Sequence, residues 1–436
     1  MRTTALWLFP ALVAVSAPLS HAQPAAANPL LDRVDRAAAA VMPKVIAWRR
    51  DFHQHPELGN REVRTAGVVA AHLRALGLEV RTGVATTGVV GVLRGGKPGP
   101  VVALRSDMDA LPVTEELSLP FKATVRTEYN GREVGVMHAC GHDAHMSMLM
   151  GAAEVLAGLK ADLAGTVVFL FQPAEEGAPE GEEGGAEVMI KEGALDNPKV
   201  DAIFGLHVFP FESGGIRVRP GGIMAAGDTV RISVRGRQTH GALPWEGVDP
   251  IVVAAQIVLG LQTIVSRQAN LTTAPAVVTL GMIQGGNRTN IIPDEVVMAG
   301  TIRTFDPAMR ESIQERVRRT ATGIAESAGA TAAVTFTPGN PITYNDPALT
   351  DRVLPMLKRV AAAGVDANAP VSTTSEDFSE YQRKVPGVFF HLGVTPKGAD
   401  PKTVEPNHSP RFFVDEGALV TGGRALASAA VDYLRR

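Results

Sequence analysis

The chain lacks several features that mark particular classes of protein. Among its 436 residues there is one cysteine, Cys140, so no disulfide can form within the chain. The formal net charge is −3, with neither a basic stripe nor an acidic tail, which argues against a nucleic-acid partner. No internal repeat and no low-complexity block is visible. With 45% hydrophobic residues, the composition indicates a globular protein with one large core or two moderate ones.

Long hydrophobic runs are also missing, apart from a short one near the N-terminus. Arg2 precedes an apolar stretch from Ala5 to Val15, and Ser20-His21-Ala22 offers a small-x-small cleavage site. The stretch is shorter than the roughly 20 residues that span a bilayer, which disfavours an uncleaved anchor. We therefore expect residues 1–22 to be a signal peptide and the mature protein to be exported to the periplasm or secreted. No later segment is expected to enter a membrane.

Apolar runs that end in turns alternate with helical segments over the first half of the chain. This alternation predicts an α/β fold in which helices cover both faces of a mixed central sheet. Helices are expected at residues 34–48, continuing toward His53, at 63–76 and at 144–159, and strands at 88–93, 101–104, 166–171 and 202–206.

The pattern changes from about Gly222. Residues 229–235 alternate in polarity as a half-exposed strand does, and the segments that follow give the order β-α-β-β-α-β of a ferredoxin-like fold. After Pro338 the helix–strand alternation resumes and ends in a helix from Glu416. We predict an α/β domain, residues 30–221 plus 339–436, interrupted by a smaller α+β domain, residues 222–338. The expected elements of the smaller domain are strands 229–235, 276–283, 295–303 and 332–336 and helices 251–266 and 309–327.

Acidic and imidazole side chains follow the predicted strands of the α/β domain. Because ligands bind at the carboxyl ends of the strands in such sheets, these residues are expected to meet at one edge. Cys140 and His142 open the helix that crosses from the same side, and His408 comes from the far end of the chain. The residues that follow the strands are Asp107, Asp109, Glu175, Glu176 and His207.

Sulfur, imidazole and carboxylate together are the ligands of a transition-metal site. The spacing of Cys140 and His142 around Gly141 is weakly specific, and each histidine alone could have a structural role, so the prediction rests on their joint occurrence. An idle thiol would also be a liability in an oxidising compartment, whereas a metal-bound thiolate would not. A buried, inert cysteine is the alternative.

Glu175 and Glu176 would face nearly opposite ways if they lay at a strand end, which favours different roles for them. One would bind a metal ion, and the other would take a proton from water that the ion activates. The alternative is an exposed acidic turn, and we assign that role only to Glu180, Glu182 and Glu183.

The order of eight segments resembles the M20 metallopeptidase family. Within that family they are similar to the amidohydrolase branch, which hydrolyses N-acyl amino acids, hippurate and auxin conjugates. The resemblance covers nearly the whole mature chain and implies a di-metal catalytic domain with an inserted lid domain. The segments are RSDMDALP, HACGHDAH, FQPAEEG, GLHV, HGALPWEGVDP, NRTNIIPDE, TSEDFS and NHSP.

The resemblance also implies roles for individual residues. Glu175 would be the general base and Asp109 would orient a ligand, while Asp107 stands where other branches have a ligand histidine and His142 takes that place. Two divalent ions, zinc or manganese, would be bound, with Cys140 bridging them. The implied metal ligands are Cys140, His142, Glu176, His207 and His408.

In the lid, three residues resemble substrate-contacting groups of the family. His240 would polarise the scissile carbonyl, and Asn290 and Arg303 would hold a substrate carboxylate. A turn at Asn290 and an ordinary strand position for Arg303 are the alternatives. A homodimer through the lid is possible, and whether His240 serves its own subunit or a neighbour is left open. Glu376-Asp377 are lesser candidates, for orienting ligands or capping a helix.

These features favour an exported metal-dependent amidohydrolase that cleaves small N-acyl amino acids. A metallocarboxypeptidase or dipeptidase acting on short peptides is the alternative with the same chemistry. A thiol enzyme with Cys140 as nucleophile and a binding protein without activity are further alternatives. Closure of the lid is expected in the catalytic cycle, with hinges near Gly222 and Pro338. The stretch after Glu176, GAPEGEEGGAEVMIKEG, is longer than the family's usual segment.

Overall fold

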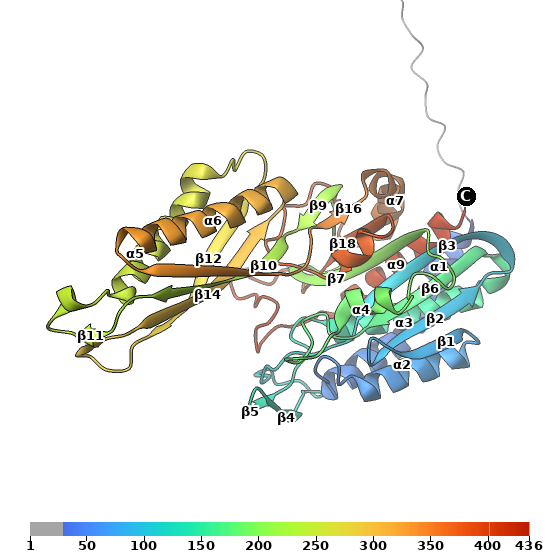
Figure 1. Cartoon of the computed structure of the whole chain (residues 1–436). Coiled ribbons are helices and arrows are strands. Elements are labelled where there is room, and N and C mark those ends of the chain that lie inside the picture. Colours follow the sequence, from blue (N-terminus) through green and yellow to red (C-terminus); the bar gives the residue numbers. More distant parts are fainter. Residues whose placement is uncertain (1–28, 401, 436) are drawn as a thin grey trace, which may run out of the picture.

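The computed structural model describes residues 29–400 and 402–435, which form two parts, each built around its own sheet (Figure 1). The predicted signal peptide, residues 1–22, lies outside the described residues, so cleavage after Ala22 and export stay predictions.

The larger part contains an eight-stranded sheet with the order β1-β2-β6-β3-β7-β18-β8-β17. β3, β6, β7 and β18 pair in parallel, whereas β2 pairs antiparallel with both β1 and β6, and β8 pairs antiparallel with β18. The sheet is therefore mixed, as predicted. The strands are β1 (Glu79–Val84), β2 (Gly88–Arg94), β3 (Lys97–Asp107), β6 (Ala164–Gln172), β7 (Ala202–Glu212), β8 (Ile216–Arg217), β17 (Val365–Asp366) and β18 (Gly387–Thr395).

The apolar runs of the central strands bury side chains on both faces of this sheet. In β6, Val167, Phe169 and Phe171 pack into one core, and the alternate residues Val168 and Leu170 pack into another. The first core is closed by α1 (Pro29–Gln54), α2 (Val63–Ala75), α3 (His142–Gly158), α7 (Pro347–Val360) and α9 (Leu419–Tyr433), and the second by α4 (Gly185–Lys191) and α8 (Phe378–Gln382). Burial on both faces explains why these strands are uniformly apolar.

The smaller part is an antiparallel sheet of four strands with the order β12-β14-β10-β15, covered on one face by α5 and α6 (Figure 1). This order and the β-α-β-β-α-β connectivity are those of the predicted ferredoxin-like lid. Side chains such as Val230, Ile257, Met298 and Val317 form its separate core. The elements are β10 (Ala226–Arg235), α5 (Pro250–Thr263), β12 (Ala276–Gly285), β14 (Glu295–Thr304), α6 (Pro307–Ser327) and β15 (Thr331–Pro338).

The start of the predicted insertion belongs structurally with the larger part. β9 (Gly221–Met224) pairs with β16 (Thr343–Asn345), and Ile223 and Met224 pack with Phe378 in a core of the larger part. The chain therefore crosses to the lid sheet between Met224 and Ala226, a few residues after Gly222. The division into two folding domains stays a prediction.

Within residues 29–400 and 402–435, one helical stretch meets the length and composition of a membrane span, contrary to our expectation that no later segment would. It is Pro250–Gln268, made of α5 and the π-helical turn Ile264–Gln268. Val253, Ile257 and Leu261 on this stretch are buried in the lid core, so the helix packs as a core helix on its inner face.

Candidate metal centre

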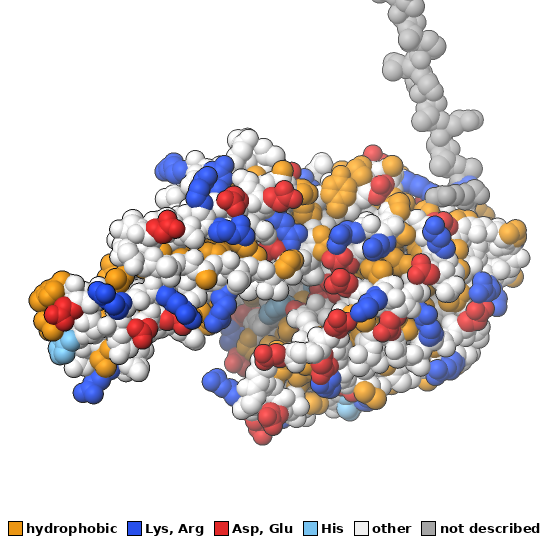
Figure 2. Space-filling model, in the orientation of Figure 1, with side chains coloured by type: hydrophobic (Ala, Val, Ile, Leu, Met, Phe, Trp, Pro, Cys, Tyr) orange, Lys and Arg blue, Asp and Glu red, His pale blue; other side chains and the backbone are white. Residues whose placement is uncertain are grey.

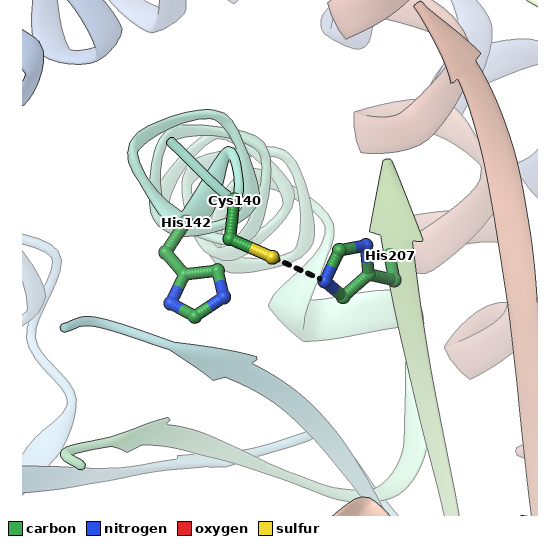
Figure 3. Close-up of side chains that lie close together, drawn as sticks. All are labelled: Cys140, His142 and His207. Atoms are coloured by element: carbon green, nitrogen blue, oxygen red, sulfur yellow. Dashed lines mark hydrogen bonds between the residues drawn. The ribbon is translucent and has the colours of Figure 1, made fainter. Parts of the chain in front are cut away.

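Cys140 and His142 lie at the N-terminal end of α3, and His207 reaches them from β7 (Figure 3). Cys140 Sγ is 3.3 Å from His207 Nε2. Gly141, which lies between Cys140 and His142 and precedes α3, has φ +89°, and a Cβ there would lie 2.4 Å from Val208 Cγ2. Only glycine allows this turn so close to β7, so the turn brings sulfur and imidazole to one point.

Backbone groups of Val208 fix the orientation of two histidines. His207 Nδ1 donates to the carbonyl oxygen of Val208 at 2.8 Å, which leaves the Nε2 lone pair facing Cys140. His145 Nε2 accepts from the N–H of Val208 at 2.9 Å, so its Nδ1 carries the proton and donates to Asp107 at 2.6 Å. Both nitrogens of His145 are used, and this side chain supports the site rather than binding a metal.

We assigned His145 no role from the sequence. Its spacing of three residues from His142 on one helix was the available signal, because such residues share a helix face. Asp107, which His145 holds, lies 3.7 Å from His142 Nε2.

The two glutamates follow a turn rather than a strand end. β6 ends at Gln172, and Ala174 has φ +51°, so the assumption that placed Glu175 and Glu176 on opposite sides is wrong. Carboxylate oxygens of both come within 4.8 Å of a His142 ring nitrogen. The Glu176 N–H donates to Asp109 Oδ2 at 2.9 Å, which ties the turn to the loop after β3.

His408 closes the site from the C-terminal segment. Its Nε2 lies 3.0 Å from Glu176 Oε1, and its N–H donates to the carbonyl oxygen of Ala139 at 2.8 Å. The side chain of Asn407 donates to the carbonyl oxygens of Cys140 and Val208, at 3.2 and 3.1 Å. These bonds fix a loop far along the chain against the turn that carries Cys140.

Several sets of side chains could hold a cation, each with its ligand atoms within 4.8 Å of one another. Three of these sets together contain all five predicted metal ligands, and each of the three includes Cys140, His142 or both. Among the residues that the structure describes, the ring nitrogens of His142 are buried and make no hydrogen bond, although Nδ1 lies 3.3 Å from Asp109 Oδ1, so this side chain is suited to bind a metal. The sets are Cys140/His142/His207, Cys140/Glu176/His408 and His142/Glu175/Glu176.

The charges around these residues also fit a cation. Burial lowers the pKa of His142, but the carboxylates of Asp107 and Asp109 outweigh it and raise the pKa to about 10. Burial, with Glu176 and Glu175 nearby, raises the pKa of the Cys140 thiol well above its usual range. The site therefore attracts positive charge, which a divalent cation supplies more strongly than a proton. The donor set fits zinc or a similar transition metal.

A second buried cluster lies behind the glutamates, around Arg105. Its guanidinium contacts Asp107 at 2.9 Å, Asp377 at 2.8 Å and Glu376 at 3.0 Å. Gln172 accepts from Arg105 Nε at 2.9 Å. Burial raises the pKa of Glu376 to about 8 and that of Asp377 to about 6, against the opposing effect of Arg105. Arg105 is the countercharge for three buried acids.

This cluster acts on Glu175. Burial, followed by the charges of Glu376 and Glu176, raises the pKa of Glu175 well above its usual range. A carboxylate with a raised pKa holds a proton more readily than an exposed one, which suits a group that must accept and then release a proton near neutral pH.

Arg303 of the lid reaches the metal centre. It lines a cavity of about 340 Å³ together with Cys140, Glu175 and His408. It passes over Gly227, where a Cβ would lie 2.3 Å from its Nη1. Ser375 Oγ lines the same cavity and, within residues 29–400 and 402–435, has no hydrogen-bond partner. Figure 2 shows the molecule hollowed between the two parts.

His240 and Asn290 lie elsewhere. They sit together where β11 (Thr239–His240) pairs with β13 (Ile291–Ile292), and the Gly241 N–H donates to the carbonyl oxygen of Asn290 at 2.8 Å. Figure 1 places β11 at the end of the lid far from the larger sheet. The structure thus brings Arg303 but not His240 or Asn290 to the metal centre, and the roles of all three stay predictions.

Residues 103–432 match the family model described as Peptidase family M20/M25/M40. The chain belongs to this family. It is 40% identical over 407 residues to thermostable carboxypeptidase 2 of Saccharolobus solfataricus, covering 93% of this chain and 99% of the relative. It is 38% identical over 393 residues to the N-acetylcysteine deacetylase of Bacillus subtilis, covering 90% and 97%.

An M20 protein of known structure has the same architecture. The YXEP protein of Bacillus subtilis, described as a dinuclear metal-binding peptidase, is 36% identical and superposes with a TM-score of 0.74, covering 90% of this chain and 98% of its own. The resemblance to M20 amidohydrolases is therefore confirmed, and the protein is an M20 family hydrolase. Its candidate metal ligands are those brought together by α3, β7 and the segments around Glu176 and His408.

Proposed function

We propose that this M20 hydrolase cleaves the amide bond of N-acyl amino acids with the help of two divalent cations. The observation that carries the proposal is the turn at Ala174, which places two adjacent carboxylates against one set of ligands. Both glutamates lie within 4.8 Å of a His142 ring nitrogen and line the cavity that contains Arg303, and Glu176 also contacts His408. Similarity to an N-acetylcysteine deacetylase supports a small N-acyl substrate.

The residues divide the reaction between them. Cys140, His142, Glu176, His207 and His408 would hold the cations, which supply the Lewis acidity that activates water and polarises a carbonyl group. Glu175 accepts the proton of the attacking water while the water oxygen adds to the acyl carbon. The C–N bond then breaks and Glu175 returns the proton to the leaving nitrogen. Arg303 binds the carboxylate of the amino-acid half through its planar guanidinium.

The test of this function is metal removal with hippurate as the substrate. We expect dialysis against a chelator to abolish hydrolysis of hippurate, because water then lacks the Lewis acid, and zinc or manganese to restore it. Liquid chromatography would measure benzoate and glycine. Alkylation of Cys140 in metal-loaded protein should be slow. Full activity in protein shown by elemental analysis to be metal-free would contradict the proposal.

Similarity to a thermostable carboxypeptidase keeps short peptides as the second candidate substrate. Both substrate classes present a free carboxylate beside the scissile amide, so Arg303 would serve either. The two classes differ on the other side of the scissile amide. An N-acyl amino acid has a neutral acyl group there, whereas an unblocked peptide carries an ammonium group. Rates on hippurate and on unblocked Phe-Gly, measured side by side, separate them.

The thiol-enzyme alternative is disfavoured by the surroundings of Cys140. A nucleophilic cysteine needs a lowered pKa. Here burial and two glutamates raise the pKa of the thiol, and burial, together with the charge of His145, lowers the pKa of His207 well below its usual range. His207 is therefore not the imidazolium that would stabilise a free thiolate.

We further propose a homodimer in which His240 serves the neighbouring subunit. The Ala242 N–H donates to His240 Nδ1 at 3.0 Å, which leaves Nε2–H free as a donor for a substrate carbonyl. Large apolar side chains are exposed on the lid, and β12 is an edge strand of its sheet. These side chains include Trp245, Val252, Leu259 and Ile283.

Co-expression of two inactive variants tests this arrangement. Glu175→Gln and His240→Ala should each be inactive alone. In hybrid dimers one site receives both intact residues, so the mixture should recover about a quarter of wild-type activity, because half of the dimers are hybrids with one working site. Sedimentation would verify the dimer. Activity of the two variants on their own would argue against a role of His240 in the neighbouring subunit. So would the absence of recovered activity in verified hybrid dimers.

A further inference from the structure

A buried carboxylate that the proposed reaction does not use lies beside residues 173–177, the glutamate turn. It belongs to Glu62, which immediately precedes α2 and is fully buried, although glutamate side chains are rarely buried. We propose that Glu62 is a positioning residue for the general base, because its carboxylate holds the peptide group that leads into Glu175. This inference rests on the proposed function, in which Glu175 accepts the proton of the attacking water.

Each oxygen of the Glu62 carboxylate accepts a hydrogen bond from a different segment. Oε1 accepts from the Ala174 N–H at 2.9 Å, and Oε2 accepts from the Thr87 hydroxyl at 2.6 Å. Ala174 follows β6 and Thr87 precedes β2, so one side chain joins the start of α2 to the ends of two paired strands. The bond to Ala174 fixes the backbone one residue before Glu175, and with it the direction in which the Glu175 side chain leaves the turn.

The backbone of Glu175 is thereby held through the residue on either side of it. The Ala174 N–H donates to Glu62, and the Glu176 N–H donates to Asp109 Oδ2 at 2.9 Å. Asp109 holds the glutamate that we assign to the metal, whereas Glu62 holds the residue before the base. Loss of the Glu62 carboxylate should therefore displace Glu175 more than Glu176.

The segment that carries Glu62 is itself fixed in place. The carboxylate of Glu57 accepts from two N–H groups at the start of α2, those of Arg64 and Thr65, at 3.1 and 2.8 Å. The carbonyl oxygen of Glu57 accepts from the Ala110 N–H at 2.8 Å, which ties the segment to the loop after β3. Glu62 therefore belongs to a rigid support for the glutamate turn.

The glutamate turn needs such a support because of the backbone of Ala174. This residue has φ +51°, in the left-handed region that a side chain with a Cβ disfavours. Its methyl group fits between Gly59 and Gly184, where added Cβ atoms would lie 3.2 and 3.0 Å from it. Without Glu62 the buried Ala174 N–H would also lack its acceptor. The turn would then relax and carry Glu175 with it.

Stability alone does not explain a carboxyl group at this position. Burial and the nearby charge of Asp109 raise the pKa of Glu62 to about 7, so its ionised form is unfavourable here. Strongly shifted pKa values are concentrated at functional sites. The carboxyl group offers an oxygen to the Ala174 N–H in either protonation state, so the hydrogen bond does not require the charge.

Glu62→Met tests the hydrogen bond, because methionine fills the space but cannot accept from the Ala174 N–H. We expect kcat on hippurate to fall at least about tenfold, with KM within about twofold of wild type, because the base is misplaced. Bound metal should be retained, since Asp109 still holds Glu176. Glu62→Gln should keep kcat within about threefold, because its amide can accept from Ala174 and donate to Thr87. Steady-state kinetics and elemental analysis would measure these effects.

Thr87→Val is the matched control. It removes the other hydrogen bond of Glu62 with little change in shape and leaves the Ala174 N–H bonded. It should lower the free energy of unfolding, measured by chemical denaturation, but keep the kcat of wild type. Should Glu62→Met fail to fold, Glu62→Asp takes its place. An aspartate is one methylene shorter and cannot reach both Ala174 and Thr87, so kcat should fall at least about threefold.

The outcomes separate this inference from the function on which it rests. An unchanged kcat in folded Glu62→Met, or in Glu62→Asp if methionine prevents folding, overturns the positioning role alone. Loss of metal from these variants also overturns it, because the metal ligands would then be what Glu62 supports. Equal losses of kcat in Glu62→Met and in either Glu62→Gln or Thr87→Val overturn it as well. Failure of metal-loaded wild-type protein to hydrolyse any N-acyl amino acid removes the proposed function and the inference with it.

Discussion

We expect Glu175→Gln to lower kcat by about 10²–10⁴-fold without loss of bound metal, because an amide cannot accept the proton of the attacking water. The side chain keeps its size and its place beside His142 and Glu376, so KM should change little. Steady-state kinetics on hippurate, with elemental analysis of the same sample, would measure both effects.

Glu176→Gln is the matched control, since it makes the same substitution one residue along the chain. Glu176 contacts His408 Nε2 at 3.0 Å and belongs to two of the candidate ligand sets, so this variant should lose metal as well as activity. Geometry alone would also allow Glu175 as a ligand, because its oxygens lie within 4.8 Å of His142 and Glu176. Loss of metal from Glu175→Gln would therefore show that Glu175 is also a metal ligand, and would refute the proposal that it acts only as the general base.

We expect Arg105→Met to destabilise the protein by about 3–5 kcal/mol at pH 8, because it leaves Glu376 and Asp377 buried without their countercharge and removes one partner of Asp107. Methionine fills much of the space, so the loss is chiefly electrostatic. Chemical denaturation followed by fluorescence would measure the free energy of unfolding.

The loss should depend on pH in a defined direction. His142 and His145 also lower the pKa of Asp107, so the pH dependence comes from Glu376 and Asp377, whose folded-state pKa values lie above their unfolded values. Their stabilising contribution is therefore present below the unfolded pKa, near 4, and is lost as pH rises through the raised pKa values. In the wild type, burial already raises the pKa of Glu376 to about 8 and that of Asp377 to about 6. The variant should be closer to wild type at pH 5 than at pH 8.

Arg94→Met provides the control for the loss of an ion pair as such. Arg94 forms a two-pronged pair with Glu79, at 2.7 and 3.1 Å, on the exposed surface of the sheet edge. Solvent screens such a pair, so little change in stability is expected. Equal losses of stability in Arg94→Met and Arg105→Met would show that burial does not determine how much the ion pairs of Arg105 contribute to the free energy of unfolding.

Much of the fold could be predicted because its local patterns agree with its tertiary environment. The uniformly apolar run at residues 166–171 is buried on both faces of a sheet, and the alternating run at 229–235 is buried on one, so each pattern gave the right kind of strand. The first residues of α1, before Val34, were not predicted, and neither was β9. The β9 strand is recognisable only from its partner, β16, more than a hundred residues away.

Parts of the site could not be predicted, because they depend on close approach between distant segments. The partners of Arg105 come from β3 and from the loop before α8, and only their shared burial makes the cluster important. His145 looked like one histidine among several until Val208 and Asp107 were seen to use both its nitrogens. The assumed strand end at Glu175 was wrong because Ala174 has a left-handed backbone.

The sequence by itself determined the chemical types in this protein: its alternation of helices and strands, one thiol among histidines, and paired carboxylates after an apolar strand. These are properties of short segments, which hydrophobic periodicity and side-chain chemistry report directly. Only the tertiary structure decided which atoms meet, placing Arg303 at the metal centre and His240 at the far end of the lid. These contacts depend on how segments that are distant in the chain pack together, and local sequence patterns do not encode that packing.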